Sequence, residues 1–115
     1  MMKQVEISEP GGPEVLVLRE AEIPEPKPFE VLIKVVAAGV NRPDIVQRQG
    51  NYKPPEGASE IPGLEVSGII TRVGHDVRGY KVDDKVCALL TGGGYAEYCC
   101  APASQILLIP DGISI

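Results

Sequence analysis

VLIKVVAAGVNRPD, residues 31–44, carries the clearest structural signal in this chain. Residues 31–40 form the longest apolar run, which predicts a β-strand buried on both faces. Asn41 then stands where this strand should end, and Pro43 suits the first turn of a helix, where its missing N–H is not needed. Residues 44–49 predict one or two helical turns, and Gly50 suits the C-terminal stop. We therefore expect Asn41 at a strand-to-helix junction, pointing into the cleft that the strand borders.

The rest of the chain alternates short apolar segments with glycine and proline, which is typical of a small β-barrel. Three prolines at alternate positions in residues 23–28 exclude regular strand or helix and predict an exposed connector. A loop is expected from Tyr52 to Pro62. Further strands are expected around Val5 and Ile7 and at residues 15–18, 66–73, 85–90, 96–101 and 106–109. The predicted fold class is mainly β with one short helix, in a single domain that spans residues 1–115.

Composition excludes several classes of function. The formal net charge is −5, and the Lys and Arg residues are scattered, which argues against a nucleic-acid partner. The first residues contain no signal-peptide pattern, and no run approaches the length of a membrane span. Three cysteines, with Cys99 and Cys100 adjacent, favour reduced thiols and a cytoplasmic location. With one Phe, four Tyr and no Trp, the core should consist mainly of Val, Ile, Leu and Ala.

Six short motifs occur in an order and at a spacing that resemble one known domain. They lie at residues 6–16, 30–35, 49–55, 62–68, 73–86 and 93–98, and include PGGPEVL, GNYKPP, PGLEVSG and GGYAEY. This pattern is similar to the N-terminal domain of the medium-chain dehydrogenase/reductase family, and the likeness covers nearly the whole chain. The resemblance implies a GroES-like, partly open β-barrel that serves as a catalytic domain.

Two residues place the resemblance in the zinc-free branch of that family, the quinone oxidoreductases related to zeta-crystallin. Zinc-dependent alcohol dehydrogenases carry a metal-binding Cys where this chain has Asn41, and an amide cannot supply a thiolate. They also have Gly-His-Glu where this chain has Gly63-Leu64-Glu65, so the imidazole is missing. Since a catalytic zinc needs about three protein ligands, and no cluster of four cysteines is present, we expect no metal site.

The resemblance also suggests site residues. Asn41 is a candidate to hydrogen-bond the cofactor or a substrate oxygen, although its amide could instead cap the helix. Tyr52 is a candidate donor to a developing oxyanion, or a loop side chain packed on prolines. Arg42 could reach a phosphate or remain solvated. Gly93, within Gly92–Gly94, could admit a planar ligand or belong to a flexible hairpin turn. Tyr52 and Asn41 are thus the predicted catalytic residues, and Asn41, Arg42, Tyr52 and Gly93 the predicted cofactor contacts.

Three further residues receive more modest expectations. His75 should lie in a surface turn, and Glu65 could be a cleft carboxylate or a solvated one. Asp83 occupies a position where the family usually has glycine. Because Asp tolerates positive φ better than most residues, we predict that Asp83 lies in a tight turn with positive φ.

The function implied is NADPH-dependent, metal-free reduction of a quinone. An enoyl or enone reductase of the same family is the nearest alternative, and a stand-alone, non-enzymatic GroES-like interaction module is the alternative from another class. No G-x-G-x-x-G fingerprint occurs, so the nucleotide-binding Rossmann domain is expected to be absent from this chain. The fragment alone should be inactive, the full-length protein a homodimer, and its partners a small quinone or enone, with neither nucleic acid nor membrane.

Overall fold

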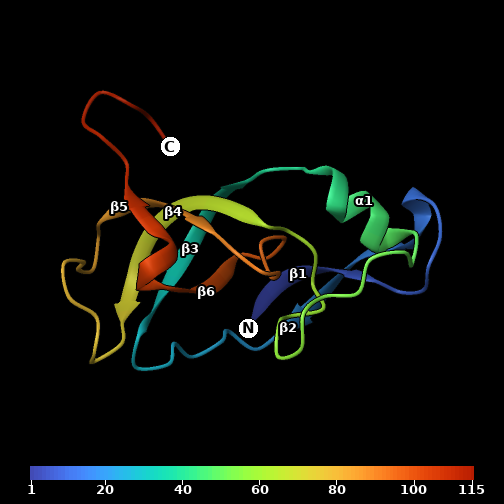
Figure 1. Ribbon diagram of the computed structural model, residues 1–115, viewed down its shortest axis with the longest axis horizontal. Coiled ribbons are helices and arrows are strands. Elements are labelled where there is room, and N and C mark those ends of the chain that lie inside the picture. Colours follow the sequence, from blue (N-terminus) through green and yellow to red (C-terminus); the bar gives the residue numbers. More distant parts are fainter.

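Two antiparallel sheets make up the fold, and the computed structural model describes residues 1–115 (Figure 1). A two-stranded ribbon pairs β1 (Met2–Ile7) with β2 (Leu16–Ala21). The five-stranded sheet has the order β6-β3-β4-β5-β7 and consists of β3 (Glu30–Ala38), β4 (Glu65–Val73), β5 (Lys85–Leu89), β6 (Tyr98–Pro102) and β7 (Ile106–Leu108). One helix, α1 (Arg42–Arg48), and two 3₁₀ turns, Pro13–Val15 and Ala103–Gln105, complete the chain. The predicted mainly β class with one short helix is confirmed.

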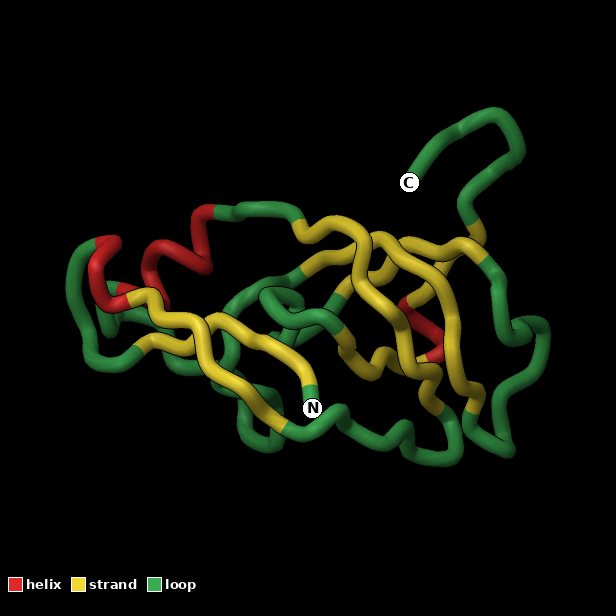
Figure 2. Tube along the Cα trace, turned by 180° about the vertical axis from the view of Figure 1, so that it is seen from behind, coloured by secondary structure: helices red, strands yellow, loops and turns green.

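The five-stranded sheet curls into a partly open barrel (Figure 2). Its two edge strands, β6 and β7, are neighbours in sequence, joined by the turn Ala103–Gln105, but they do not pair with each other. The sheet therefore remains open between them, as the resemblance implied. α1 has 7 residues, so the structure contains no helix of membrane-spanning length.

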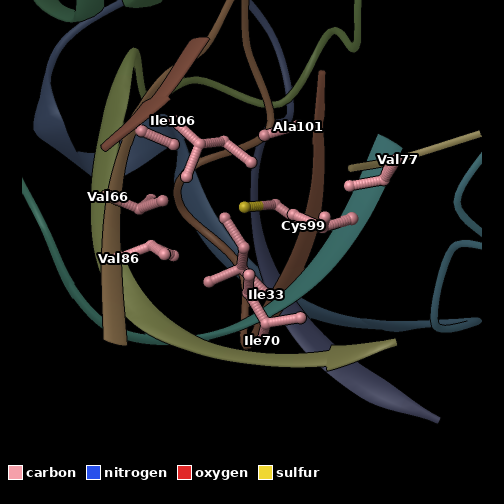
Figure 3. Packing of buried hydrophobic residues seen from close by; sticks show 10 residues of the cluster. Ile33, Val66, Ile70, Val77, Val86, Cys99, Ala101 and Ile106 are labelled. Carbon is pink, nitrogen blue, oxygen red and sulfur yellow. The ribbon is translucent and has the colours of Figure 1, made fainter. Parts of the chain in front are cut away.

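Aliphatic side chains fill the inside of the curl (Figure 3). Ile33, Ile70 and Val86 are completely buried, and Ile106 and Cys99 point into the same space. Burying one such side chain contributes about 1.5–3 kcal/mol relative to leaving it exposed. The core thus has the aliphatic character expected from the scarcity of aromatic residues.

The expectation that residues 31–40 are buried on both faces is wrong beyond Ile33. Val31 to Ile33 are buried, but Val36 and Val40 are 56% and 76% exposed. The pairing explains the difference, because β6 accompanies β3 only from Glu30 to Lys34. Past Lys34 the only strand that pairs with β3 is β4, and β3 leaves the core and ends at Ala38.

Two predicted strand boundaries also differ from the structure. Val15 ends a 3₁₀ turn, and the second strand begins at Leu16. Residues 95–97 precede β6 and connect the ribbon to the sheet. The Val5 N–H donates to the Tyr95 carbonyl at 2.8 Å, and the Val35 N–H donates to the Glu97 carbonyl at 2.8 Å. This segment is bonded on both sides, so it joins the two sheets into one fold.

The turn between β4 and β5 confirms the prediction for Asp83. Asp83 has a φ of 76° and is the one residue other than glycine with positive φ. Its backbone N–H donates to the Ile70 carbonyl at 2.8 Å, which ties the turn to the end of β4. His75 lies exposed in the preceding turn beside Asp76, as expected.

Candidate functional site

Asn41 lies where β3 gives way to α1, as predicted, and it is the N-cap residue of that helix. Its extended backbone, with φ −127° and ψ 158°, turns the chain into the helix. Its N–H donates to the Asp44 carboxylate at 3.0 Å, and the Asp44 N–H donates to the Asn41 carbonyl at 3.0 Å. Arg42 and Pro43 begin the helix, and Gly50, with a φ of 88°, follows its end. The capping position of Asn41 is thus established, and its ligand role stays a prediction.

Asp44 is a buried charged residue that sequence reasoning did not single out. It is 5% exposed and is the one buried polar or charged side chain in the structure. Besides the Asn41 N–H, its carboxylate accepts the Gly63 N–H at 3.3 Å and the Tyr95 O–H at 2.7 Å. Burial, followed by the hydrogen bond and the negative charge of Asp44, raises the pKa of Tyr95 above its ordinary value. The phenol is therefore held in its neutral, donating form.

Two glycine-bearing loops meet beside Asp44. We define the first glycine loop as residues 61–64 and the second as residues 92–95. Gly93, Gly94 and Tyr95 donate backbone N–H groups to the carbonyls of Ile61, Gly63 and Pro62, at 2.7, 3.1 and 2.9 Å. A Cβ added to Gly63 would lie 2.6 Å from the Cα of Gly94. The two loops therefore touch backbone to backbone, which only glycine permits.

The second glycine loop is not the hairpin turn that was one interpretation of Gly92–Gly94. β5 and β6 lie apart in the sheet, so no hairpin joins them. Gly93 instead has a φ of 94° and lines a cavity of about 430 Å³ together with Thr91, Ser59 and Ile61. The buried residue Cys99 also lines this cavity.

The remaining predicted site residues lie on α1 and in the loop after it. Arg42 is exposed at the first position of the helix, and Tyr52 is half-buried three residues beyond Gln49. Neither they nor Asn41 line the cavity next to Gly93. The far end of α1 is anchored separately, because the Gly11 N–H donates to the Arg48 carbonyl at 3.0 Å. Of the four candidate residues, Gly93 alone lines this cavity.

A second hollow, of about 750 Å³, lies on the outer face of the sheet. Ala37, Ser67, Cys87 and Leu107 form one row across β3, β4, β5 and β7 and line it. Glu65 is exposed at the rim of this hollow. Antiparallel sheets usually turn polar side chains outward, so an outer row of small and apolar residues is unusual.

The side chains that could hold a metal ion do not gather anywhere. No group of three or more His, Cys, Asp or Glu residues is placed to bind one. Leu64 is half-buried in the first glycine loop, and Asn41 provides one amide at most. The donor set that a catalytic zinc requires is therefore not assembled by this chain.

The three cysteines are free thiols in different environments. Cys87 is exposed, whereas Cys99 is buried and Cys100 is half-buried on β6. Burial raises the pKa of Cys99 to about 12 and that of Cys100 to about 11. Both thiols of β6 are therefore protonated and unreactive near neutral pH.

Comparison with known proteins identifies the domain. The model of the alcohol dehydrogenase GroES-like domain matches residues 27–111. A quinone oxidoreductase from Lama guanicoe is 41% identical over 112 residues, which are 96% of this chain and 34% of that protein.

Solved structures give the same result. The human synaptic vesicle membrane protein VAT-1 homolog-like protein superposes with a TM-score of 0.91 at 37% identity, over 98% of this chain and 37% of that one. The Escherichia coli quinone oxidoreductase complexed with NADPH gives a TM-score of 0.86 at 32% identity, over 97% and 34%. The chain spans about a third of the length of the curated relatives it matches, between 27% and 35%. It belongs to the alcohol dehydrogenase GroES-like domain family, among relatives that include quinone oxidoreductases.

Proposed function

We propose that this chain is the catalytic-domain part of an NADPH-dependent quinone oxidoreductase. The observation that carries the proposal is the 41% identity to a quinone oxidoreductase over nearly the whole chain. The NADPH complex of the Escherichia coli enzyme, whose fold this chain shares at a TM-score of 0.86, supports the choice of cofactor. Because the chain spans only a third of such enzymes, the proposed activity belongs to a longer polypeptide.

The cofactor would meet this chain at its second glycine loop. A Cβ added to Gly93 would contact only the Ser59 side chain, at 3.6 Å, so the backbone there is open to a flat ring. Arg42 is exposed at the start of α1 and would be available to a phosphate. The net charge of −5 is unfavourable for binding the remaining phosphates of the dinucleotide. These features fit a contact with one end of NADPH and leave the greater part of its binding to residues outside this chain.

NADPH supplies the hydride when it is bound. In our proposal, the part of this chain is to orient the acceptor, exclude water and stabilise the negative charge that develops on the acceptor oxygen. Asn41 and Tyr52 are the proposed donors to that oxygen, and no zinc takes part. Removing one oxyanion donor typically lowers kcat by about 10²–10³, and we expect a smaller loss here because quinones accept electrons readily.

Titration with NADPH tests the proposal. The longest natural polypeptide that carries this chain should bind NADPH and oxidise it with a quinone, and the 115-residue chain alone should do neither at a useful rate. Substantial NADPH oxidation by the short chain would overturn the division of labour between the two parts. Absence of quinone-dependent oxidation by the long polypeptide would overturn the proposed function.

The same assay separates the enoyl or enone reductase alternative. A quinone and an enoyl thioester offered side by side should favour the quinone if the proposal is right. The downstream reading frame decides the non-enzymatic alternative, because a strand followed by a Gly-rich turn would favour an enzyme and a stop codon would favour an interaction module. We also propose a cytoplasmic, homodimeric enzyme, with the free thiols of this chain as support for the reducing compartment.

A further inference from the structure

We propose that Asp44 is a positioning residue, which fixes Asn41 relative to the two glycine loops. The inference rests on the proposed function, because it concerns how the residues of the proposed site are held relative to one another. Asp44 touches neither the proposed cofactor contact Gly93 nor the acceptor in this proposal. It acts through the groups that its carboxylate holds.

The carboxylate joins three segments that are distant in sequence. Its partners Asn41, Gly63 and Tyr95 lie 3, 19 and 51 residues away, and their hydrogen bonds measure 3.0, 3.3 and 2.7 Å. An acid that only caps a helix needs the first of these bonds and can remain in solvent. Asp44 is 5% exposed. Burial of a charged group is expensive unless its hydrogen bonds are made, so the three donors and the carboxylate depend on one another.

Close packing would carry a displacement of Tyr95 to the rest of the candidate site. The Tyr95 N–H is bonded to the Pro62 carbonyl, and the Gly93 N–H, two residues earlier, is bonded to the Ile61 carbonyl. There is no space between the loops for one to slide past the other, since a single methyl group on Gly63 would already collide with Gly94. Loss of the Tyr95 bond should therefore shift the second glycine loop relative to Asn41.

The displacement caused by loss of the Tyr95 hydrogen bond should remain local to the beginning of α1. The other end of the helix is held by the turn at Gly11, where the Arg48 Nε donates to the Gly11 carbonyl at 3.1 Å. Gln47 also donates to the Glu60 carbonyl, at 2.8 Å. We call Asp44 and its three partners, Asn41, Gly63 and Tyr95, the Asp44 cluster. Weakening this cluster should therefore loosen the beginning of α1 and the two glycine loops while the barrel core is unchanged.

Two matched substitutions test the inference. Tyr95→Phe removes the hydroxyl that donates to Asp44. Tyr80→Phe removes a hydroxyl that donates to the Ile106 carbonyl, also at 2.7 Å and also partly buried, but at the other end of the barrel. Because each variant loses one phenol hydrogen bond, Tyr80→Phe controls for the general loss of stability in Tyr95→Phe. Asp44→Asn provides a second disruption of the cluster that keeps the size of the side chain.

The first measurement uses amide resonances of the ¹⁵N-labelled chain. Tyr95→Phe should move the resonances of Asn41, Gly63 and Gly93, and Tyr80→Phe should leave them in place. The second measurement is kcat with a quinone in the longest natural polypeptide that carries this chain. We expect Tyr95→Phe to lower kcat roughly tenfold, less than the ~10²-fold that a 1 Å misplacement can cost, with little change in KM for NADPH. Asp44→Asn should lower kcat further, and Tyr80→Phe should retain it.

Each outcome decides the inference. Equal kcat values in Tyr95→Phe and Tyr80→Phe, or unmoved amide resonances at Asn41 in Tyr95→Phe, would overturn it. If the unsubstituted polypeptide shows no quinone-dependent oxidation of NADPH, the proposed function fails instead. In that case the amide resonances alone decide whether Asp44 fixes Asn41 against the second glycine loop. If the resonances of Asn41, Gly63 and Gly93 all move in Tyr95→Phe, the inference is supported. If the Gly63 resonance moves and those of Asn41 and Gly93 do not, the inference is refuted.

Discussion

Replacing Gly63 by alanine tests the close packing of the two glycine loops. Gly63 has a φ of 110°, a backbone conformation that side chains with a Cβ rarely adopt. The new methyl group would lie 2.6 Å from the Cα of Gly94 and 2.6 Å from the backbone nitrogen of Tyr95. Both neighbours are backbone atoms, so no flexible side chain can move away to make room.

Gly79→Ala separates the two costs. Gly79 has a φ of 87°, and a Cβ there would meet nothing within 4 Å. Positive φ costs alanine about 1–2 kcal/mol, and a gain of about 0.4–1 kcal/mol from the less flexible unfolded chain offsets part of it. We therefore expect Gly79→Ala to lower the free energy of unfolding by about 0.5–1 kcal/mol. Gly63→Ala adds overpacking against backbone, about 1–3 kcal/mol, for a total of about 1.5–4 kcal/mol.

Urea unfolding followed by far-UV circular dichroism measures both variants, and this probe is suitable because the chain has no Trp. With a urea dependence of about 1–3 kcal/mol per molar, the midpoint of Gly63→Ala should fall clearly below that of Gly79→Ala. Equal losses in the two variants at unchanged slopes would refute the contact between the loops. A stable Gly63→Ala would also remove the mechanical basis for coupling Tyr95 to Gly93.

Three further predictions follow from the turn at Asp83 and from the titratable groups. Asp83→Gly should raise the free energy of unfolding by about 0.5–1 kcal/mol, because glycine relieves the positive φ; a lower urea midpoint would contradict this. At pH 8 a thiol reagent should modify Cys87 first and Cys99 only as the chain unfolds, whereas three equal rates would exclude the burial described above. Between about pH 7 and pH 9 the contribution of the buried thiols to stability should be constant, and at higher pH it should fall. In the folded chain the pKa of Cys99 is about 12 and that of Cys100 about 11, and both exceed the ordinary thiol pKa of 9.0. Because the folded state holds these protons more tightly than the unfolded state, both thiols stabilise the fold below pH 9. This stabilisation is lost as the pH rises from 9 through the two folded-state pKa values. Tyr95, whose pKa is raised from 10.0, adds to the loss above pH 10; urea midpoints that do not change up to pH 11 would contradict this reasoning.

Local signals in the sequence predicted local structure well. The helix begins beside Pro43 and ends before Gly50 because both residues have backbone preferences that act within one turn of the chain. The positive φ of Asp83 followed from the same kind of argument. The apolar run at residues 31–40 misled because hydrophobicity does not say how many neighbours a strand has. β6 covers β3 only as far as Lys34, and that limit depends on a segment more than sixty residues later in the chain.

The candidate site shows the same division between local and distant causes. The spacing Asn41-x-x-Asp44 is a capping signal that could have drawn attention to Asp44, but it predicts an exposed acid with one backbone partner. Burial of Asp44 results from Gly63 and Tyr95, which only the topology of the barrel brings to it. Capping and ligand binding were alternatives for Asn41. Asn41 and Asp44 form a capping box, in which the Asp44 carboxylate accepts the Asn41 N–H and the side-chain oxygen of Asn41 faces the Asp44 N–H. The proposed ligand role requires the other half of the amide, its NH₂ group, because only that half can donate to an acceptor oxygen. A residue that is rigidly held by its backbone is better suited to orient an acceptor than one on a mobile loop, and the Tyr95→Phe variant measures how much of that rigidity the buried carboxylate provides.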